Sequence, residues 1–355
     1  MHYVANIISI IIPCRNEEKY IENCIKSIQS FILPNHKEVE ILFIDGESTD
    51  NTKSIILNFS KLDKRILLIN NPNIFQSFAI NIGINKAIGE WILRLDAHTL
   101  YPKRYLIDLF ETAIETNSDN CGGQIITEIG GDTYGAKIVQ ALSTHPFGVG
   151  DSGFRTESKQ GEVDTVPFGF FKKELFNKIG FFDERLIRAQ DYEFNRRILR
   201  SGGKIWMNPN IKTTYYNQPT LRGFYKKQFF KEAPYNAYMW YLAPYTFAYR
   251  HAITGVFATG LIGGMLLSPF FSFIKYIFFS IMVLYFVLAF ISAIQQAKRY
   301  KNLLHMFTLP ISFLLYHFLH GLGVLWGLLR LATNTAPVQK IKEPWSGYGS
   351  NRIIL

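Results

Sequence analysis

The chain has 355 residues, enough for one full α/β domain and a smaller module. Hydrophobic residues make up 48% of it, with 30 Phe and 19 Tyr, which is high for a soluble protein but too low for a chain embedded in a membrane throughout. The net charge of +10 is compatible with a nucleic acid, an anionic membrane surface, a phosphorylated substrate, or only a solvated basic face. Because no zinc-finger spacing occurs and the basic residues flank apolar segments, we expect membrane lipids and phosphates as partners and no nucleic acid.

The cysteines point to a reducing compartment. Cys14, Cys24 and Cys121 form neither a CxxC pair nor a paired framework, which argues against a disulfide scaffold and a structural zinc ion. Residues 1–12 show no charged region followed by a small-residue cleavage site, so we expect no secretory signal.

The first hundred residues alternate between predicted strands and predicted helices. Strands are indicated by the isoleucine-rich run 7–12 and by the apolar runs 39–44, 66–69 and 91–95. Apolar residues at helical spacing lie between these runs. This alternation predicts a mainly parallel sheet with right-handed crossovers, which binds ligands at the carboxyl ends of its strands.

Polar residues follow three of these strands and should meet at one edge of the sheet. They are Arg15 and Glu17 after the first strand, Asp45 at the end of the second, and Asp96 with His98 after the fourth. Asp45 can accept from a base N–H or a ribose hydroxyl, and Asp96 with His98 can ligate a divalent cation that bridges two phosphates. Taken alone, each is more often a turn or helix-cap residue.

The next region is predicted to be irregular. Residues 122–166 are rich in glycine, notably in the stretch 145–153, so we expect a mobile segment that covers the substrate. Order should return at residue 167, with helices predicted over 172–179 and 192–200.

The last third of the chain is predicted to meet a membrane. Residues 221–250 interleave aromatic and basic side chains, as interfacial helices do, although an aromatic docking surface is the alternative. The segments 252–271, 274–294 and 307–331 each have about the 20 residues needed to cross a bilayer. A two-crossing hairpin with a re-entrant segment is the alternative topology. The basic residues around the first two segments favour a multi-pass protein of the cell membrane with its N-terminal domain on the cytoplasmic face.

These patterns divide the chain into four predicted parts. They are a catalytic domain over residues 1–220, interfacial helices over 221–250, a transmembrane region over 251–332 and a C-terminal tail over 333–355.

The motifs of the first part resemble family 2 glycosyltransferases, which are inverting enzymes with the GT-A fold. The resemblance covers residues 7–235 and is carried by the Pro-Cys-Arg-Asn-Glu-Glu run 13–18, the Asp-Gly-Glu-Ser-Thr-Asp run 45–50, the Asp-Ala-His run 96–98 and the Gln-Asp-Tyr-Glu run 190–193. The last two elements are similar to those of membrane-attached exopolysaccharide glucosyltransferases of the succinoglycan type.

The resemblance implies a Rossmann-like mixed sheet, mainly parallel, followed by interfacial and transmembrane helices. The implied nucleotide-binding residues are Pro13, Arg15, Glu17, Asp45 and Asp96. Asp96 and His98 are the implied ligands of Mn²⁺ or Mg²⁺, and Asp191 is the implied catalytic base.

Two departures from the family pattern affect these roles. The usual Asp-x-Asp is Asp96-Ala97-His98 here, which makes the metal site less anionic and suits Mn²⁺ better on grounds of ligand softness. The usual acidic pair before the base is Gln190-Asp191. Two plainer readings therefore stay open: His98 only hydrogen-bonds a phosphate, or Asp191 only caps a helix.

Six residues are expected to contact the acceptor or the sugar. They are His145 in the segment 145–151, Phe168, Gly169, Gln190, Arg222 and Gln228. Arg222 can meet the diphosphate of a lipid-linked acceptor or bind anionic lipid. The chain lacks the Gln-x-x-Arg-Trp element of processive synthases, which favours addition of a single sugar.

We therefore expect transfer of one sugar from a nucleotide-sugar to a lipid-linked saccharide, and Asp45 favours a UDP-sugar. The alternatives are a polyprenyl-phosphate sugar synthase and a catalytically silent membrane scaffold that binds nucleotide-sugars.

Overall fold

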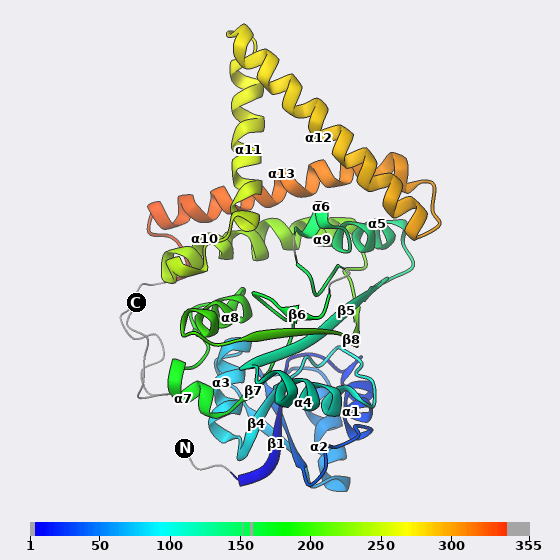
Figure 1. The fold of residues 1–355 in the computed structure, drawn as a ribbon, viewed down its shortest axis with the longest axis vertical. Coiled ribbons are helices and arrows are strands. Elements are labelled where there is room, and N and C mark those ends of the chain that lie inside the picture. The colour runs from blue at the N-terminus through cyan, green and yellow to red at the C-terminus, as the bar shows by residue number, and fades with distance from the viewer. Residues whose placement is uncertain (1–3, 151, 157–158, 339–355) are drawn as a thin grey trace. The chain divides into compact units, whose positions relative to one another are not determined.

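A computed structural model describes residues 4–150, 152–156 and 159–338 of the chain (Figure 1). These residues fold as two compact units, each assembled from separate stretches of chain. Of the described residues, unit 1 contains 4–126 and 159–215. Unit 2 contains the described residues of 127–156 together with the helices after residue 215. The predicted boundaries at residues 220, 250 and 332 stay predictions, and most of the predicted tail lies outside the described residues.

Unit 1 is built on a mixed β-sheet, which confirms the predicted fold class. Its strands are β1 (Val4–Cys14), β2 (Glu38–Asp45), β3 (Ile66–Asn70), β4 (Gly89–Arg94), β5 (Asn120–Glu128), β6 (Gly161–Glu162), β7 (Phe170–Lys172) and β8 (Ile205–Tyr216). In the described residues their order is β3-β2-β1-β4-β7-β5-β8-β6. Pairing is parallel from β3 through β4, whereas β7 is antiparallel to both β4 and β5.

The parallel half of the sheet is buried on both faces. Ile8, Ile10, Ile11 and Ile12 of β1 are fully buried, which explains why the strand reads as a nearly continuous apolar run. The helices of this unit are α1 (Ile21–Gln29), α2 (Thr52–Leu62), α3 (Gln76–Lys86), α4 (Tyr105–Thr116), α7 (Glu174–Ile179) and α8 (Gln190–Arg200). Helix α3 packs on β1 and β2, α2 packs on β3, and α4 packs on β7.

The expectation of an irregular segment over residues 122–166 is wrong for much of its length. This stretch contains most of β5, the helix α5 (Tyr134–Ser143), the short helix α6 (Pro146–Val149) and β6. The glycines that suggested a loop serve close packing inside the sheet. A Cβ atom on Gly123 would lie 2.1 Å from the carbonyl oxygen of Ile211, and one on Gly122 would lie 2.7 Å from Cβ of Val166.

Unit 2 is helical. Besides α5 and α6 it contains α9 (Leu221–Lys227), the π-helix η1 (Gln228–Glu232), α10 (Ala233–Leu242), the 3-10 helix η2 (Pro244–Thr246), α11 (Tyr249–Leu267), α12 (Ser272–Arg299) and α13 (His305–Ala332). Helix α13 packs against α10, α11 and α12. Within this unit, α10 runs alongside α13, whereas α11 and α12 extend away from α13 and meet at their far ends (Figure 1).

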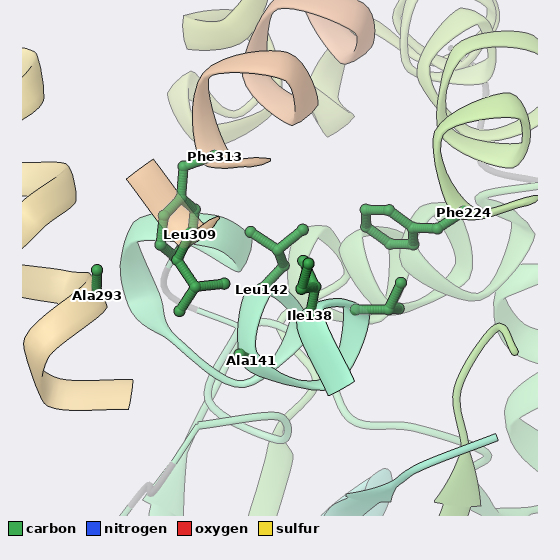
Figure 2. Close-up of a cluster of buried hydrophobic side chains, with 8 residues drawn as sticks. Ile138, Ala141, Leu142, Phe224, Ala293, Leu309 and Phe313 are labelled. Atoms are coloured by element: carbon green, nitrogen blue, oxygen red, sulfur yellow. The ribbon is translucent and has the colours of Figure 1, made fainter. Parts of the chain in front are cut away.

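A buried apolar cluster joins α5 to the C-terminal helices (Figure 2). Its members are Ile138, Val139, Ala141 and Leu142 from α5, Phe224 from α9, Ala293 from α12, and Leu309 and Phe313 from α13. The side-chain amide of Gln296 also donates to the carbonyl oxygen of Ala141 at 2.6 Å. The stretch 127–156 therefore folds with helices that follow it by more than 60 residues of chain.

Three helices of unit 2 are long and apolar enough to cross a membrane. They are α11, α12 and α13, with mean hydropathies of 1.2, 2.7 and 1.5. Large apolar side chains such as Phe273, Val256 and Phe307 are exposed on them. Apolar surface of this kind suits contact with lipid. The three predicted apolar segments are confirmed as helices, and the number that cross a bilayer stays a prediction.

Candidate active site

Asp45 lies at the carboxyl end of β2, next to Pro13 at the end of β1. Its side chain is only 1% exposed. Ile44, the residue before Asp45, pairs in register with Pro13. Oδ2 of Asp45 accepts from the backbone N–H of Ser48 at 3.0 Å and lies 3.3 Å from Nζ of Lys53. Oδ1 is buried and has no hydrogen-bond partner among the described residues. A buried carboxylate oxygen without a partner points to a donor that a ligand supplies.

The loop after β1 is tied to the loop after β2. The backbone N–H of Asn16 donates to Oγ of Ser48 at 2.9 Å, and the backbone N–H of Glu17 donates to Oγ1 of Thr52 at 2.7 Å. These bonds fix the backbone beside Asp45 and leave the side chain of Arg15 exposed. The predicted nucleotide-binding residues of β1 and β2 thus share one edge of the sheet.

His98 is oriented by Glu17. Its Nδ1 lies 3.1 Å from Oε1 of Glu17, and its side chain is 42% exposed. The hydrogen bond to Glu17 raises the pKa of His98 above its ordinary value, although partial burial acts in the opposite direction. When Nδ1 carries the proton that Glu17 accepts, Nε2 of the neutral ring keeps its lone pair for a metal ion, whereas the protonated ring donates its Nε2–H to a phosphate oxygen.

Asp96 and His98 can supply two ligands to a divalent cation. Among the described residues, no three His, Cys, Asp or Glu side chains are grouped closely enough to hold a metal ion by themselves. A carboxylate and an imidazole with diphosphate oxygens form a donor set that fits Mn²⁺ or Mg²⁺. The residues therefore fit a divalent cation completed by oxygens of a ligand.

Arg94 was not among the predicted site residues. It is the last residue of β4 and only 4% exposed. Its Nη2 lies 2.8 Å from Oδ1 of Asp96, and its Nη1 lies 3.2 Å from Oδ2 of Asp191. One buried guanidinium thus joins the predicted metal ligand to the predicted base. The sequence did contain a signal for this role, namely a charged residue inside the apolar run 91–95, because buried charges are rare unless they are paired.

Asp191 lies in the first turn of α8 but does not cap it. The N-cap residue is Ala189, in a left-handed conformation with φ of 62°, and its side chain makes no capping hydrogen bond. Burial raises the pKa of Asp191, whereas the Arg94 guanidinium acts to lower it. Oδ1 of Asp191 is a buried atom without a hydrogen-bond partner among the described residues. A buried carboxylate oxygen without a partner points to a donor that a ligand supplies.

Two glutamines connect Asp191's helix to Asp96. The amide of Gln190, which is buried, donates to Oε1 of Gln76 at 2.8 Å, and the amide of Gln76 donates to Oδ1 of Asp96 at 3.2 Å. Gln76 begins α3 and was not among the predicted residues. The predicted sugar contact Gln190 is thus part of the network that positions Asp96.

Phe168 and Gly169 directly precede β7 and contact Arg94. Phe168 is buried and has a positive φ of 63°, and the Arg94 guanidinium carbon lies 5.8 Å from the centre of its ring. Gly169 has φ of 125°, and a Cβ atom on it would lie 2.2 Å from the ring of Phe171. Only glycine fits there. Contact of either residue with a sugar stays a prediction.

The other predicted acceptor residues belong to unit 2. Nδ1 of His145 accepts from the backbone N–H of Phe147 at 3.0 Å and caps α6, and its Nε2 lies 2.7 Å from Oε1 of Gln295. Arg222 is exposed on α9, and Gln228 begins η1. Their roles toward an acceptor stay predictions, and Asp151 of the predicted segment 145–151 lies outside the described residues.

Residues 9–180 match the family model described as glycosyl transferase family 2. A protein of Methanococcus voltae, named dolichyl N-acetyl-alpha-D-glucosaminyl phosphate 3-beta-D-2,3-diacetamido-2,3-dideoxy-beta-D-glucuronosyltransferase, is 28% identical over 337 residues, which cover 92% of this chain and 98% of that protein. Succinoglycan biosynthesis protein ExoA of Rhizobium meliloti (strain 1021) is 30% identical over 214 residues, which cover 60% of this chain and 64% of that protein.

A solved structure shares the fold. The mannosyltransferase PcManGT from Pyrobaculum calidifontis, in complex with GDP-Man and Mn²⁺, superposes with a TM-score of 0.59 at 17% identity, over 90% of this chain and 87% of that chain. At 17% identity this similarity is evidence for a shared fold only.

Proposed function

We propose that this chain, whose residues 9–180 match the model of glycosyltransferase family 2 and whose fold is of the GT-A type, transfers a single sugar, with inversion, from a nucleotide-sugar to a lipid-linked saccharide. The observation that carries the proposal is the contact of one buried arginine with two acidic residues at the carboxyl edge of the sheet. Arg94 contacts Asp96 on one side and Asp191 on the other, and Asp191 keeps one oxygen without a partner in the described part of the chain.

The donor would bind at the ends of β1, β2 and β4. Oδ1 of Asp45 would accept the N–H of a uracil-type base, which is why a UDP-sugar is the preferred donor. Asp96 and His98 would hold a divalent cation against the diphosphate. When bound, such a cation stabilises the negative charge that develops on the leaving group.

Asp191 would act as the general base. Its free oxygen would take the proton of the acceptor hydroxyl while that oxygen attacks the anomeric carbon from the face opposite the diphosphate. Burial raises the pKa of Asp191 and so makes it a better proton acceptor than an exposed aspartate. One displacement inverts the anomeric carbon, so no covalent enzyme nucleophile is required.

A lipid-linked acceptor is supported by the membrane-length helices and by the relatives. The Methanococcus voltae protein, which matches most of this chain, is named for a dolichyl-phosphate-linked sugar acceptor. Exposed basic residues of α9, including Arg222, suit an anionic headgroup or diphosphate. The charges that flank the apolar helices favour a multi-pass protein of the cell membrane with unit 1 on the cytoplasmic face.

The test is release of nucleoside diphosphate by the detergent-solubilised full chain. A panel of UDP- and GDP-sugars is supplied with membrane lipid extract, with and without Mn²⁺ or Mg²⁺. The proposal expects lipid- and metal-dependent release from one donor, lost in Asp191→Asn and kept in the matched variant Asp108→Asn, whose side chain pairs with Arg104 on α4. Nucleotide binding without release from any donor would favour the scaffold, and release driven by a plain polyprenyl phosphate would favour the polyprenyl-phosphate sugar synthase.

A further inference from the structure

Unit 2 contains a cavity of about 450 Å³ between α6, α11, α12 and α13. This volume is within the range of small-molecule pockets, about 300–1,000 Å³. Much of its wall is apolar and aromatic, from Phe147, Ile253, Phe257, Tyr285 and Tyr316. It lies among the helices that are long and apolar enough to span a membrane. We call it the unit 2 cavity.

Aromatic rings pack against one another around the unit 2 cavity. Phe257 stacks on Tyr285 with ring centres 4.8 Å apart, and Phe147 meets the same tyrosine edge-on at 5.4 Å. Phe147 also lies 5.2 Å from the ring of His317. Because α6 supplies Phe147 and the long helices supply the other rings, the wall is assembled from segments far apart in sequence.

The polar groups of the wall are held in fixed orientations. Nδ1 of His317 lies 2.9 Å from the hydroxyl of Tyr285, and Nδ1 of His320 lies 2.8 Å from Oγ1 of Thr254. The two histidines are three residues apart on α13, so they face the same side of that helix. Polar side chains at membrane depth are costly and mark functional positions more often than structural ones.

The permanent charge of the wall is at one end of α11. Arg250 is the second residue of this helix, and its Nε donates to Nε2 of His251 at 3.3 Å. Both residues line the cavity, and none of its described lining residues is acidic. A guanidinium at the end of an apolar helix lies where phosphate headgroups occur in a bilayer. The wall therefore suits an anion at one end and hydrocarbon along the rest.

We propose that the unit 2 cavity binds the phosphate and the first isoprenoid units of the lipid carrier of the acceptor. The inference rests on the proposed function and adds where the carrier is held. A polyisoprenyl phosphate fits better than a phosphoglyceride because a single cavity accommodates one branched chain, whereas a phosphoglyceride brings two. The aromatic wall contacts the isoprenoid units, and Arg250 with the adjacent His251 contacts the phosphate.

The test measures lipid binding by the full chain without any donor, so it does not depend on catalysis. A fluorescent polyisoprenyl phosphate is titrated in detergent, and polyisoprenol without phosphate, phosphatidylglycerol and inorganic phosphate serve as competitors. Ile253→Trp narrows the cavity, and Val256→Trp is its control on an exposed position of α11 that does not line it. Arg250→Gln removes the charge, with Lys298→Gln as its control at the exposed end of α12.

We expect Ile253→Trp and Arg250→Gln to weaken binding about tenfold or more, because the first fills space that the lipid would occupy and the second removes a charged contact with the phosphate, while the two controls bind as the wild type does. The three competitors should each displace the probe poorly. The proposal would be overturned if both lining variants bound the probe as tightly as the wild type does. It would also be overturned if phosphatidylglycerol or inorganic phosphate displaced the probe at the same concentration as unlabelled polyisoprenyl phosphate.

A failure of this inference is distinguishable from a failure of the proposed function. Asp191→Asn should bind the lipid normally while losing transfer. If no sugar is transferred by any variant but the lining variants still lose the lipid, the cavity assignment holds and the reaction is wrong. Should Ile253→Trp unfold, Arg250→Gln carries the same test.

Discussion

Arg94 offers the sharpest test of the active-site geometry. Its two terminal nitrogens contact two different carboxylates, Asp96 at 2.8 Å and Asp191 at 3.2 Å. Arg94→Lys keeps the positive charge, but a single ammonium group cannot reproduce both arms of the guanidinium. Arg94→Met removes the charge as well and leaves the two carboxylates without the cation between them.

The expected losses follow from these contacts. A hydrogen bond to a charged group is worth about 1.5–3 kcal/mol, which is about 10- to 150-fold in kcat/KM when expressed fully in the transition state. Because Asp191 is 34% exposed, the lower end of this range applies to its contact. We expect Arg94→Lys to lose about tenfold or somewhat more, and Arg94→Met to lose more than Arg94→Lys.

The pH dependence of kcat/KM distinguishes this role of Arg94 from a merely structural one, because only the first shifts the acidic limb of the profile. Burial raises the pKa of Asp191, Arg94 lowers it, and Asp96 raises it. A base must be deprotonated, so kcat/KM rises as the pH rises through this pKa. Removing Arg94 lets the pKa rise further, which moves the acidic limb of the profile to higher pH in Arg94→Met and by less in Arg94→Lys.

The assay is kcat/KM for sugar transfer as a function of pH at saturating donor. Arg104→Met is the matched control, because Arg104 pairs with Asp108 on the exposed face of α4. Thermal unfolding is measured in parallel, since breaking a buried ion pair can cost about 3–5 kcal/mol of stability. An acidic limb that stays in place in folded Arg94→Met would refute the role of Asp191 as the base that Arg94 tunes.

Three further predictions follow from the same contacts. Asp45→Asn should weaken nucleotide binding about tenfold while leaving metal activation intact, measured as the Kd for UDP, because its free oxygen is the proposed acceptor for the base. His98→Ala should raise the Mn²⁺ concentration needed for half-maximal activity, measured by titrating metal at saturating donor, and unchanged metal dependence would remove His98 from the site. Leu142→Ala, in the fully buried cluster of unit 2, should lower stability by about 2–5 kcal/mol in thermal unfolding, whereas Leu62→Ala at an exposed position should not.

The parts of the fold that the sequence predicted are those with strong local patterns. The strand β1 is a run of fully buried isoleucines, and the acidic residues Asp45 and Asp96 follow directly where apolar strands end. The three long helices are each apolar over about the 20 residues that a membrane crossing requires, which is a strong local signal. Local signals of this kind need no knowledge of which segments meet.

The parts that were missed depend on tertiary contacts. Most of β5 falls in the stretch 122–166, which its glycine content predicts to be irregular, and only the approach of Ile211 in β8 shows that Gly123 serves close packing in the sheet. In β8 the buried residues alternate with less buried ones, but Pro209 and the asparagines on either side of it interrupt the apolar run, so its sequence pattern is weak. The contact of Arg94 with Asp191 joins residues 97 positions apart, which no spacing in the sequence reveals.

The most direct test of the central claim is transfer of labelled sugar into lipid. A nucleotide-sugar labelled in the sugar is incubated with the full chain and a lipid-linked saccharide, and the label in the organic phase is counted for the wild type, Asp191→Asn and Asp108→Asn. The account predicts label in lipid for the wild type and Asp108→Asn, and a loss of about 10²–10⁴-fold in Asp191→Asn. Equal labelling by Asp191→Asn, or no labelled lipid with any donor, would contradict it.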